Sequence, residues 1–235
     1  MRATCCRFTI ALVLASVMQT LALAAAPIRF LPRQVILACP HDSANRQPGA
    51  VCPANVLVGG GQTLSGYTFS VRPGTALPPG ISLASSTGII TAEGDTSVLP
   101  PANTKRPIYL TVRDDAGRTA NGVVTLVVQK QGGSCGCPGL KIAAGPLPLA
   151  YAKEPYSVTL ALVGPPPSGG LRPSYVWKVA KGSSIPPGLV LDQTRGVLRG
   201  TPAPSASRKA FNFSVEVTDT HTRQQASGLY TLYVY

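Results

Sequence analysis

The sequence repeats itself at a distance of 108 residues. The segment 77–83 reads LPPGISL, and the segment 185–191 reads IPPGLVL. A repeat of this spacing has the length of one β-sandwich domain, and a chain of 235 residues has room for two. The further matching pairs are 67–71 with 175–179, 88–90 with 196–198 and, at a shift of 105 residues, 108–114 with 213–219.

The repeated segments carry the pattern of half-buried strands. In 67–71, in 175–179 and in 211–218, apolar residues alternate with polar ones. A period of two residues places every second side chain on the same face of a sheet. We expect the largest of these side chains, Phe69, Trp177 and Phe213, to lie in the cores.

Between these strands each copy has a Pro-Pro-Gly corner. The prolines preset φ near −65° and remove two donors, and the glycine can supply the positive φ of a sharp turn. The predicted turn residues are Pro78, Pro79 and Gly80 in the first copy and Pro186, Pro187 and Gly188 in the second.

The composition fits the same architecture. The chain has 24 Gly and 23 Pro, and no segment after the N-terminus sustains a helical period. Many short strands with frequent turns predict an all-β fold of two tandem β-sandwiches. The expected boundaries are 25–131 for the first, degenerate sandwich, 132–138 for a cysteine-containing linker and 139–235 for the second sandwich.

Six segments of the second copy carry a family pattern: 156–160, 175–177, 185–189, 191–192, 196–202 and 213–219. In these segments the second copy resembles the immunoglobulin-like, dystroglycan-type cadherin-like repeats of bacterial extracytoplasmic proteins. The resemblance covers about residues 140 to 235, and in the first copy 92–94 depart from the pattern. It implies that the two tandem β-sandwiches are immunoglobulin/cadherin-like and serve as an extracytoplasmic binding, adhesion or spacer unit.

Residues 1–24 are expected to be a cleaved signal peptide. Arg2 and Arg7 precede an apolar run from Phe8, and small residues at 22–24 suit a signal peptidase. The alternative is an uncleaved anchor, but the run is short for a membrane span and no second one follows. The exported protein would be periplasmic, on the cell surface or secreted, with no transmembrane segment after cleavage.

The chain is basic, with a net charge of +12 that becomes +10 without Arg2 and Arg7. Such a charge could attract nucleic acid, anionic lipid or acidic glycans. The basic residues are scattered, however, and no aromatic ladder accompanies them, which argues against a specific nucleic-acid site. General solubility is the simpler interpretation.

Four cysteines follow the signal peptide: Cys39, Cys52, Cys135 and Cys137. Export favours disulfides, and four cysteines allow three pairings. The favoured scheme joins Cys39 to Cys52, and leaves Cys135 and Cys137 to close on each other or to link a second chain. The rival scheme joins Cys39 or Cys52 to the linker. A redox dithiol and a zinc site of all four cysteines are further alternatives.

Calcium is the one cofactor that the sequence leaves open, at Asp114, Asp115, Asp192 and Asp219. Calcium takes six to eight oxygen ligands, whereas these acids stand where a carboxylate can simply cap a turn. No nucleophile elbow or phosphate loop occurs, so we expect no enzyme activity. The predicted function is a non-enzymatic binding or adhesion module for a protein or glycan partner in the cell envelope. The alternative is a structural spacer or assembly subunit of an envelope complex.

Overall fold

The computed structural model describes residues 26–31, 34–40, 49–61, 66–92, 96–129, 137–165 and 173–235; the expected signal peptide lies outside them. The predicted all-β class is confirmed. The elements in chain order are β1 (Arg29–Phe30), β2 (Val35–Cys39), β3 (Ala50–Val51), β4 (Ala54–Asn55), β5 (Val58–Gly59), β6 (Thr68–Val71), β7 (Ile81–Leu83), β8 (Ile89–Ala92), the 3-10 helix η1 (Thr96–Val98), β9 (Thr104–Arg113), β10 (Thr119–Val128), β11 (Lys141–Ile142), β12 (Gly145–Pro146), β13 (Tyr156–Thr159), β14 (Leu162–Val163), β15 (Tyr175–Val179), β16 (Leu189–Leu191), β17 (Val197–Gly200), the 3-10 helix η3 (Pro204–Ala206), β18 (Lys209–Asp219) and β19 (Gln225–Val234).

Two of the four sheets each belong to one half of the chain. The N-terminal sheet has the order β3-β2-β10-β9-β6, and the C-terminal sheet has the order β12-β19-β18-β15. Each contains a long antiparallel hairpin, β9–β10 or β18–β19, whose alternating buried residues face the core. The four strands of these hairpins are the longest that the structure describes. The segments 108–114 and 213–219, in which apolar and polar residues alternate without interruption, fall on β9 and β18.

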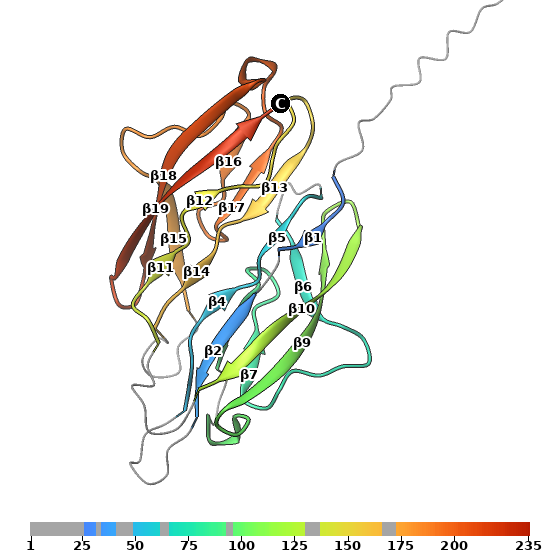
Figure 1. The fold of residues 1–235 in the computed structure, drawn as a ribbon, viewed down its shortest axis with the longest axis vertical. Helices are drawn as coiled ribbons and strands as arrows, with labels where there is room; N and C mark the ends of the chain where they lie inside the picture. Colours follow the sequence, from blue (N-terminus) through green and yellow to red (C-terminus); the bar gives the residue numbers. More distant parts are fainter. Residues whose placement is uncertain are drawn as a thin grey trace, which may run out of the picture.

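The other two sheets contain strands from both halves. The first shared sheet has the order β1-β5-β13-β17-β16, and the second has the order β11-β14-β4-β8-β7. The junctions are two antiparallel pairings, Gly59 with Val158 and Ala54 with Val163. The two halves therefore lie side by side and are joined by backbone hydrogen bonds as well as by the chain itself (Figure 1). The domain boundaries expected from the sequence stay a prediction.

The cores of the two halves also interlock. Phe69, Trp177 and Phe213 are each at most 2% exposed. Ile89 of the N-terminal half packs in the C-terminal core, whereas Val197 of the C-terminal half packs in the N-terminal core. These two residues occupy the same position of the repeat, so each half packs an equivalent side chain into the core of the other half.

The Pro-Pro-Gly corners form similar turns in both halves. Gly80 has a φ of 74° and Gly188 a φ of 89°, and each lies just before a strand of a shared sheet. At Gly188 a Cβ atom would collide with the backbone oxygen of Thr201, so this position admits no side chain. The prolines and the glycine together turn the chain sharply.

A disulfide joins Cys52 to Cys137 across 85 residues of sequence. The favoured pairing of Cys39 with Cys52 is therefore wrong, and the rival scheme with a linker cysteine holds for Cys52. Cys52 directly follows β3 and lies two residues before β4, and Cys137 lies four residues before β11; β4 and β11 belong to the second shared sheet. The reason is tertiary: the shared sheet brings the two segments together, whereas the sequence showed only the short distance from Cys39 to Cys52.

This disulfide also corrects the alternatives that depend on Cys137. Its sulfur is bonded to Cys52, so it does not close on Cys135 or link a second chain, and it supplies no thiol to a redox dithiol or a four-cysteine zinc site. Cys39 is disulfide-bonded too. Cys135 itself lies outside the described residues.

Candidate binding surface

Asp114 and Asp219 occupy equivalent places at the ends of the two long hairpins. The Asp114 carboxylate accepts a hydrogen bond from the Arg118 backbone N–H at 2.9 Å and forms an ion pair with the Arg118 guanidinium at 2.7 Å. The Asp219 carboxylate accepts hydrogen bonds from the backbone N–H groups of His221 and Thr222, at 2.8 and 3.1 Å. Both carboxylates are buried and hold their turns closed.

Asp192 closes a third turn. Its Oδ1 accepts hydrogen bonds from the hydroxyl and the N–H of Thr194 and from the N–H of Arg195, at 2.9 to 3.1 Å. Burial raises the pKa of Asp192, but these hydrogen bonds and the charge of Arg195 outweigh it, so the net pKa lies below its usual value. Asp115 is exposed beside Asp114. In the part of the chain that the structure describes, no three His, Cys, Asp or Glu residues gather as metal ligands would. The calcium site stays a prediction.

The outer face of the C-terminal sheet exposes a group of large apolar side chains. They are Leu149, Tyr151, Tyr233 and Tyr235, with exposed fractions of 52, 51, 48 and 57%. We call these four residues the tyrosine platform. Side chains of this size are normally more covered, and a contiguous exposed group of them often marks a binding surface.

Backbone pairing fixes the platform in place. The segment around Ala150 runs parallel to the end of β19, and Ala150 pairs with Val234. Both of these residues are buried, so their neighbours in sequence point outward. The rings of Tyr151 and Tyr235 lie 6.1 Å apart, centroid to centroid, which restricts both side chains.

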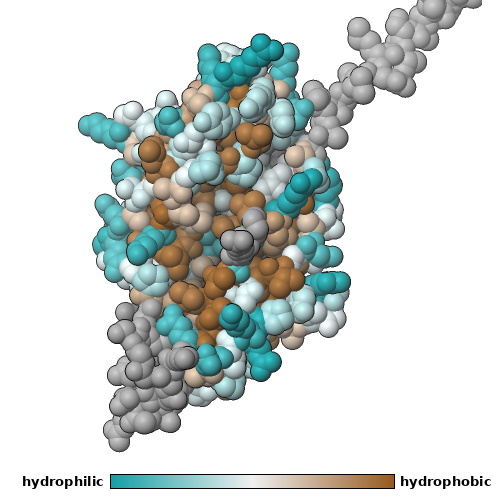
Figure 2. Space-filling view, viewed as in Figure 1, coloured by the Kyte–Doolittle hydropathy of each residue, from teal (hydrophilic) through white to brown (hydrophobic). Residues whose placement is uncertain are grey.

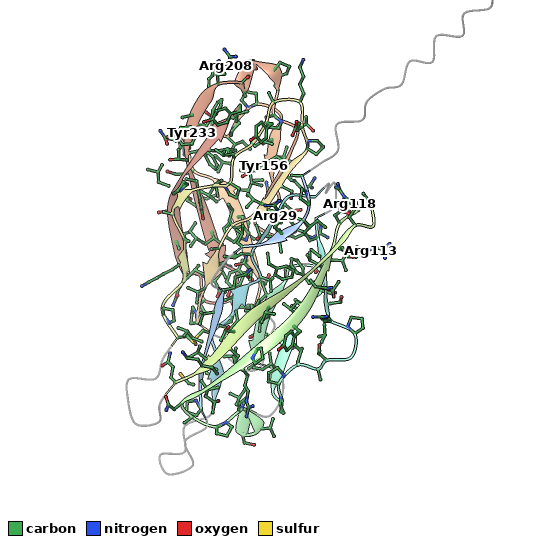
Figure 3. All side chains as sticks on the ribbon, turned by 45° about the vertical axis from the view of Figure 1, so that its right-hand side comes forward. Arg29, Arg113, Arg118, Tyr156, Arg208 and Tyr233 are labelled. Carbon is green, nitrogen blue, oxygen red and sulfur yellow. A yellow bond between two sulfur atoms is a disulfide. The ribbon has the colours of Figure 1, made fainter. Side chains whose placement is uncertain are left out.

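The edges of the platform are small or basic. Ala210 of β18, a small residue, lies opposite Tyr233. Lys153 lies two residues after Tyr151. Arg208 directly precedes β18, two residues before Ala210. Tyr233 and Arg208 both lie toward the end of the C-terminal half that points away from the N-terminal half (Figure 3).

A smaller exposed apolar group lies on the N-terminal sheet. Val123 of β10 is opposite Tyr109 of β9, and Val35 of β2 lies one strand further on. Figure 2 shows that apolar residues also cover the centre of one face of the molecule. A separate groove of about 420 Å³ is lined by residues of the 76–79 and 98–107 segments, half of which are prolines. Neither feature gathers aromatic rings as the platform does.

Sequence reasoning did not find the platform. Tyr233 and Tyr235 alternate with Leu232 and Val234, so the period of two residues shows that the tyrosines share a face. The pattern does not tell which of two apolar faces is buried. The pairing of Ala150 with Val234, which adds Leu149 and Tyr151 to that face, is a tertiary contact between residues far apart in sequence.

Comparison with known proteins identifies the C-terminal half. Residues 141–235 match the family model described as "Putative Ig domain". The resemblance predicted from the sequence is thereby confirmed for this part of the chain. No curated protein matches the sequence.

Solved structures with a similar arrangement include cadherins and immunoglobulin-domain proteins. Drosophila N-cadherin EC1-3 is 12% identical with a TM-score of 0.32, and the match covers 89% of this chain and 68% of that one. Human desmocollin-1 is 15% identical with a TM-score of 0.34, covering 89% and 42%. The first eight immunoglobulin domains of Down Syndrome Cell Adhesion Molecule are 14% identical with a TM-score of 0.34, covering 90% and 24%. The chain thus spans between a quarter and two thirds of the length of these structures.

Proposed function

We propose that this chain, whose residues 141–235 carry an immunoglobulin-like domain, is an exported, non-enzymatic binding or adhesion module. Its partner would be a protein or glycan of the cell envelope. The family match and the disulfide support an extracytoplasmic role, because disulfides persist in oxidising compartments. Within the residues that the structure describes, no helix has the length and apolar character to cross a lipid bilayer.

The observation that carries the proposal is the tyrosine platform. Tyrosine is among the residues that contribute most to recognition, because its ring offers a large apolar area and its hydroxyl can form hydrogen bonds. Tyr233 lies on the long paired strand β19, and the pairing of Ala150 with Val234 holds Leu149 and Tyr151 beside it, so little conformational entropy is lost when a partner binds.

The shared sheets favour a second candidate function, that of a rigid spacer or assembly subunit of an envelope complex. A body crossed by two continuous sheets and fastened by a disulfide would hold its ends at a fixed separation. Weak calcium binding belongs to this second proposal, and a melting temperature that rises with added calcium and falls with chelator would support it. A spacer does not need exposed tyrosines, which is why we prefer the binding module.

A binding experiment on cell envelopes tests the first proposal. The full exported chain is labelled and titrated onto envelopes of the organism that makes it. We expect saturable binding that unlabelled chain displaces and that Tyr233→Ala reduces. Tyr109→Ala is the matched control, because Tyr109 is an exposed tyrosine on the other terminal sheet.

General attraction of a basic protein would give a different result. Exposed charges are strongly screened at an ionic strength of about 0.5 M, so non-specific binding would disappear there for every variant alike. Binding that does not saturate, or that loses the same fraction in Tyr109→Ala as in Tyr233→Ala, contradicts the proposed function.

A further inference from the structure

We propose that the tyrosine platform binds an acidic glycan, with sugar rings stacked on the tyrosines and the anionic groups of the glycan paired with Lys153 and Arg208. This inference rests on the proposed function and names the chemical class of the partner. The anionic groups are carboxylates or sulfates, which present the same charge to a lysine or an arginine.

The shape of the platform suits a sugar chain. Tyr151 and Tyr235 present neighbouring rings, and Tyr233 lies two residues before Tyr235 on the same face of β19. The C–H face of a pyranose is apolar and lies flat on an aromatic ring, and the tyrosine hydroxyls can bond to sugar hydroxyls. The platform is also small. A stable protein interface needs about 20 to 30 residues on each side, and the platform has four, of which three are aromatic.

The charges around the platform favour an anionic ligand. Lys153 and Arg208 are exposed, the first two residues after Tyr151 and the second two residues before Ala210, with Lys209 next to Arg208 and Glu154 next to Lys153. Residues 139–235 as a whole contain ten Lys and Arg against four Asp and Glu. An arginine or lysine next to a stacked ring could pair with an anionic group on the sugar bound there.

The backbone at the two basic residues has an uncommon conformation. Lys153 has a φ of 67° and Arg208 a φ of 59°, in the left-handed region where glycine or asparagine is favoured. Only four non-glycine residues of the described chain have a positive φ, and these are two of them. Residues held in such conformations cluster at functional sites. Glycine would adopt this conformation with less strain, so the turn alone does not require a lysine or an arginine.

Arg223 provides a matched control for Arg208. It also has a positive φ, of 61°, and it is exposed in the turn between β18 and β19. The length of those strands places it about 33 Å from the platform. Arg208→Gly and Arg223→Gly therefore remove the same charge and relieve the same backbone conformation at opposite ends of one hairpin.

The test measures binding of the full exported chain to alginate and heparin oligosaccharides as carboxylated and sulfated probes, and to neutral dextran. We expect binding to at least one acidic probe. Tyr233→Ala and Tyr151→Ala should each weaken it about ten-fold, and Tyr233→Phe should largely retain it. Arg208→Gly should weaken binding without lowering the melting temperature, whereas Arg223→Gly and Tyr109→Ala should leave binding within about two-fold of wild type.

Several results would overturn the inference. Equal losses in Arg208→Gly and Arg223→Gly would show general attraction to a basic protein. Unchanged binding in a correctly folded Tyr233→Ala variant would remove the platform from the site; should that variant fail to fold, the result for Tyr151→Ala decides. Binding to dextran alone would contradict the acidic ligand. If no glycan binds while envelope binding still depends on Tyr233, the partner is a protein: the inference fails and the proposed function stands.

Discussion

At the scale of single residues, the repeat preserves a contact between a glycine and an aromatic ring. Gly88 lies against the ring of Phe69, and Gly196 lies against the ring of Trp177, at equivalent positions of the two copies. A Cβ atom on Gly88 would stand 2.8 Å from Cζ of Phe69, and one on Gly196 would collide with Cε2 of Trp177. Both glycines also have a positive φ. In each copy the glycine has no side chain, and this leaves space for the large aromatic ring.

We therefore expect Gly196→Ala to destabilise the protein strongly. Gly182→Ala is the matched control, since Gly182 also has a positive φ but has open space around it. The control should cost about 1 kcal/mol from the left-handed conformation alone. Gly196→Ala should cost about 1 to 3 kcal/mol more, because the buried Trp177 must move. Urea unfolding measures the loss of stability in both variants. Equal losses would show that Trp177 moves aside at no cost in free energy.

Asp192 predicts a dependence of stability on pH. A carboxyl whose pKa is lower in the folded than in the unfolded state stabilises the fold above its unfolded pKa, and this stability is lost as pH falls through the folded pKa. The pKa of Asp192 is lowered in the folded protein. The difference in unfolding free energy between wild type and Asp192→Asn should therefore shrink as the pH is lowered from about 5 to 3. A difference that stays constant over this range would contradict the assignment.

At the scale of elements, the unusual strand is β13. All four of its residues, Tyr156 to Thr159, are buried, instead of every second one. The reason is that β13 lies in the middle of the first shared sheet and is covered on both faces. The Thr159 hydroxyl accepts a hydrogen bond from the Val58 N–H at 2.7 Å. A polar residue here serves the junction between the halves.

Asn55 serves the same junction from the other side. Its side-chain amide donates to the Leu160 carbonyl at 2.6 Å and accepts from the Leu162 N–H at 2.8 Å, in buried surroundings. Asn55→Ala should lower the unfolding free energy by about 2 to 4 kcal/mol, because both backbone groups lose their partner.

Asn121→Ala is the control for this variant. Asn121 forms an exposed hydrogen bond with Thr111 within the N-terminal sheet, and its loss should cost less than about 0.5 kcal/mol. If the two variants are equally stable, the Asn55 contacts do not hold the halves together.

The elements show how far sequence reasoning extends. Alternation predicted strands at 67–71, 175–179 and 211–218, and the structure has β6, β15 and β18 there. The short strands β4, β5 and β14 were not predicted. They have two residues each, too few to show a period, and they exist because strands of the other half pair with them.

At the scale of the whole molecule, the shared sheets couple the two halves. Neither half can unfold alone without breaking both junction pairings and exposing Ile89 or Val197. We therefore expect a single cooperative transition in calorimetry and in urea. Two separated transitions would show that the halves are independent domains.

The Cys52–Cys137 disulfide belongs to the same scale. Closing a loop of 85 residues stabilises a protein by about 4.5 kcal/mol according to the chain-entropy estimate. The double variant Cys52→Ala/Cys137→Ala should lower the midpoint in urea and still unfold in one step. A double variant as stable as wild type would show that the disulfide adds nothing to the constraint that the sheets already impose.

The sequence by itself determined the all-β class, the repeat, the corners and the strands at 67–71, 175–179 and 211–218, because these depend on local period and turn chemistry. Only the tertiary structure decided which strands pair across the halves, which cysteines bond and which tyrosines share the exposed face. The physical reason is that β-sheets are held by backbone hydrogen bonds, which are the same for every residue except proline. Alternation therefore tells which side chains share a face, whereas the partner of a strand is chosen by the packing of the whole molecule.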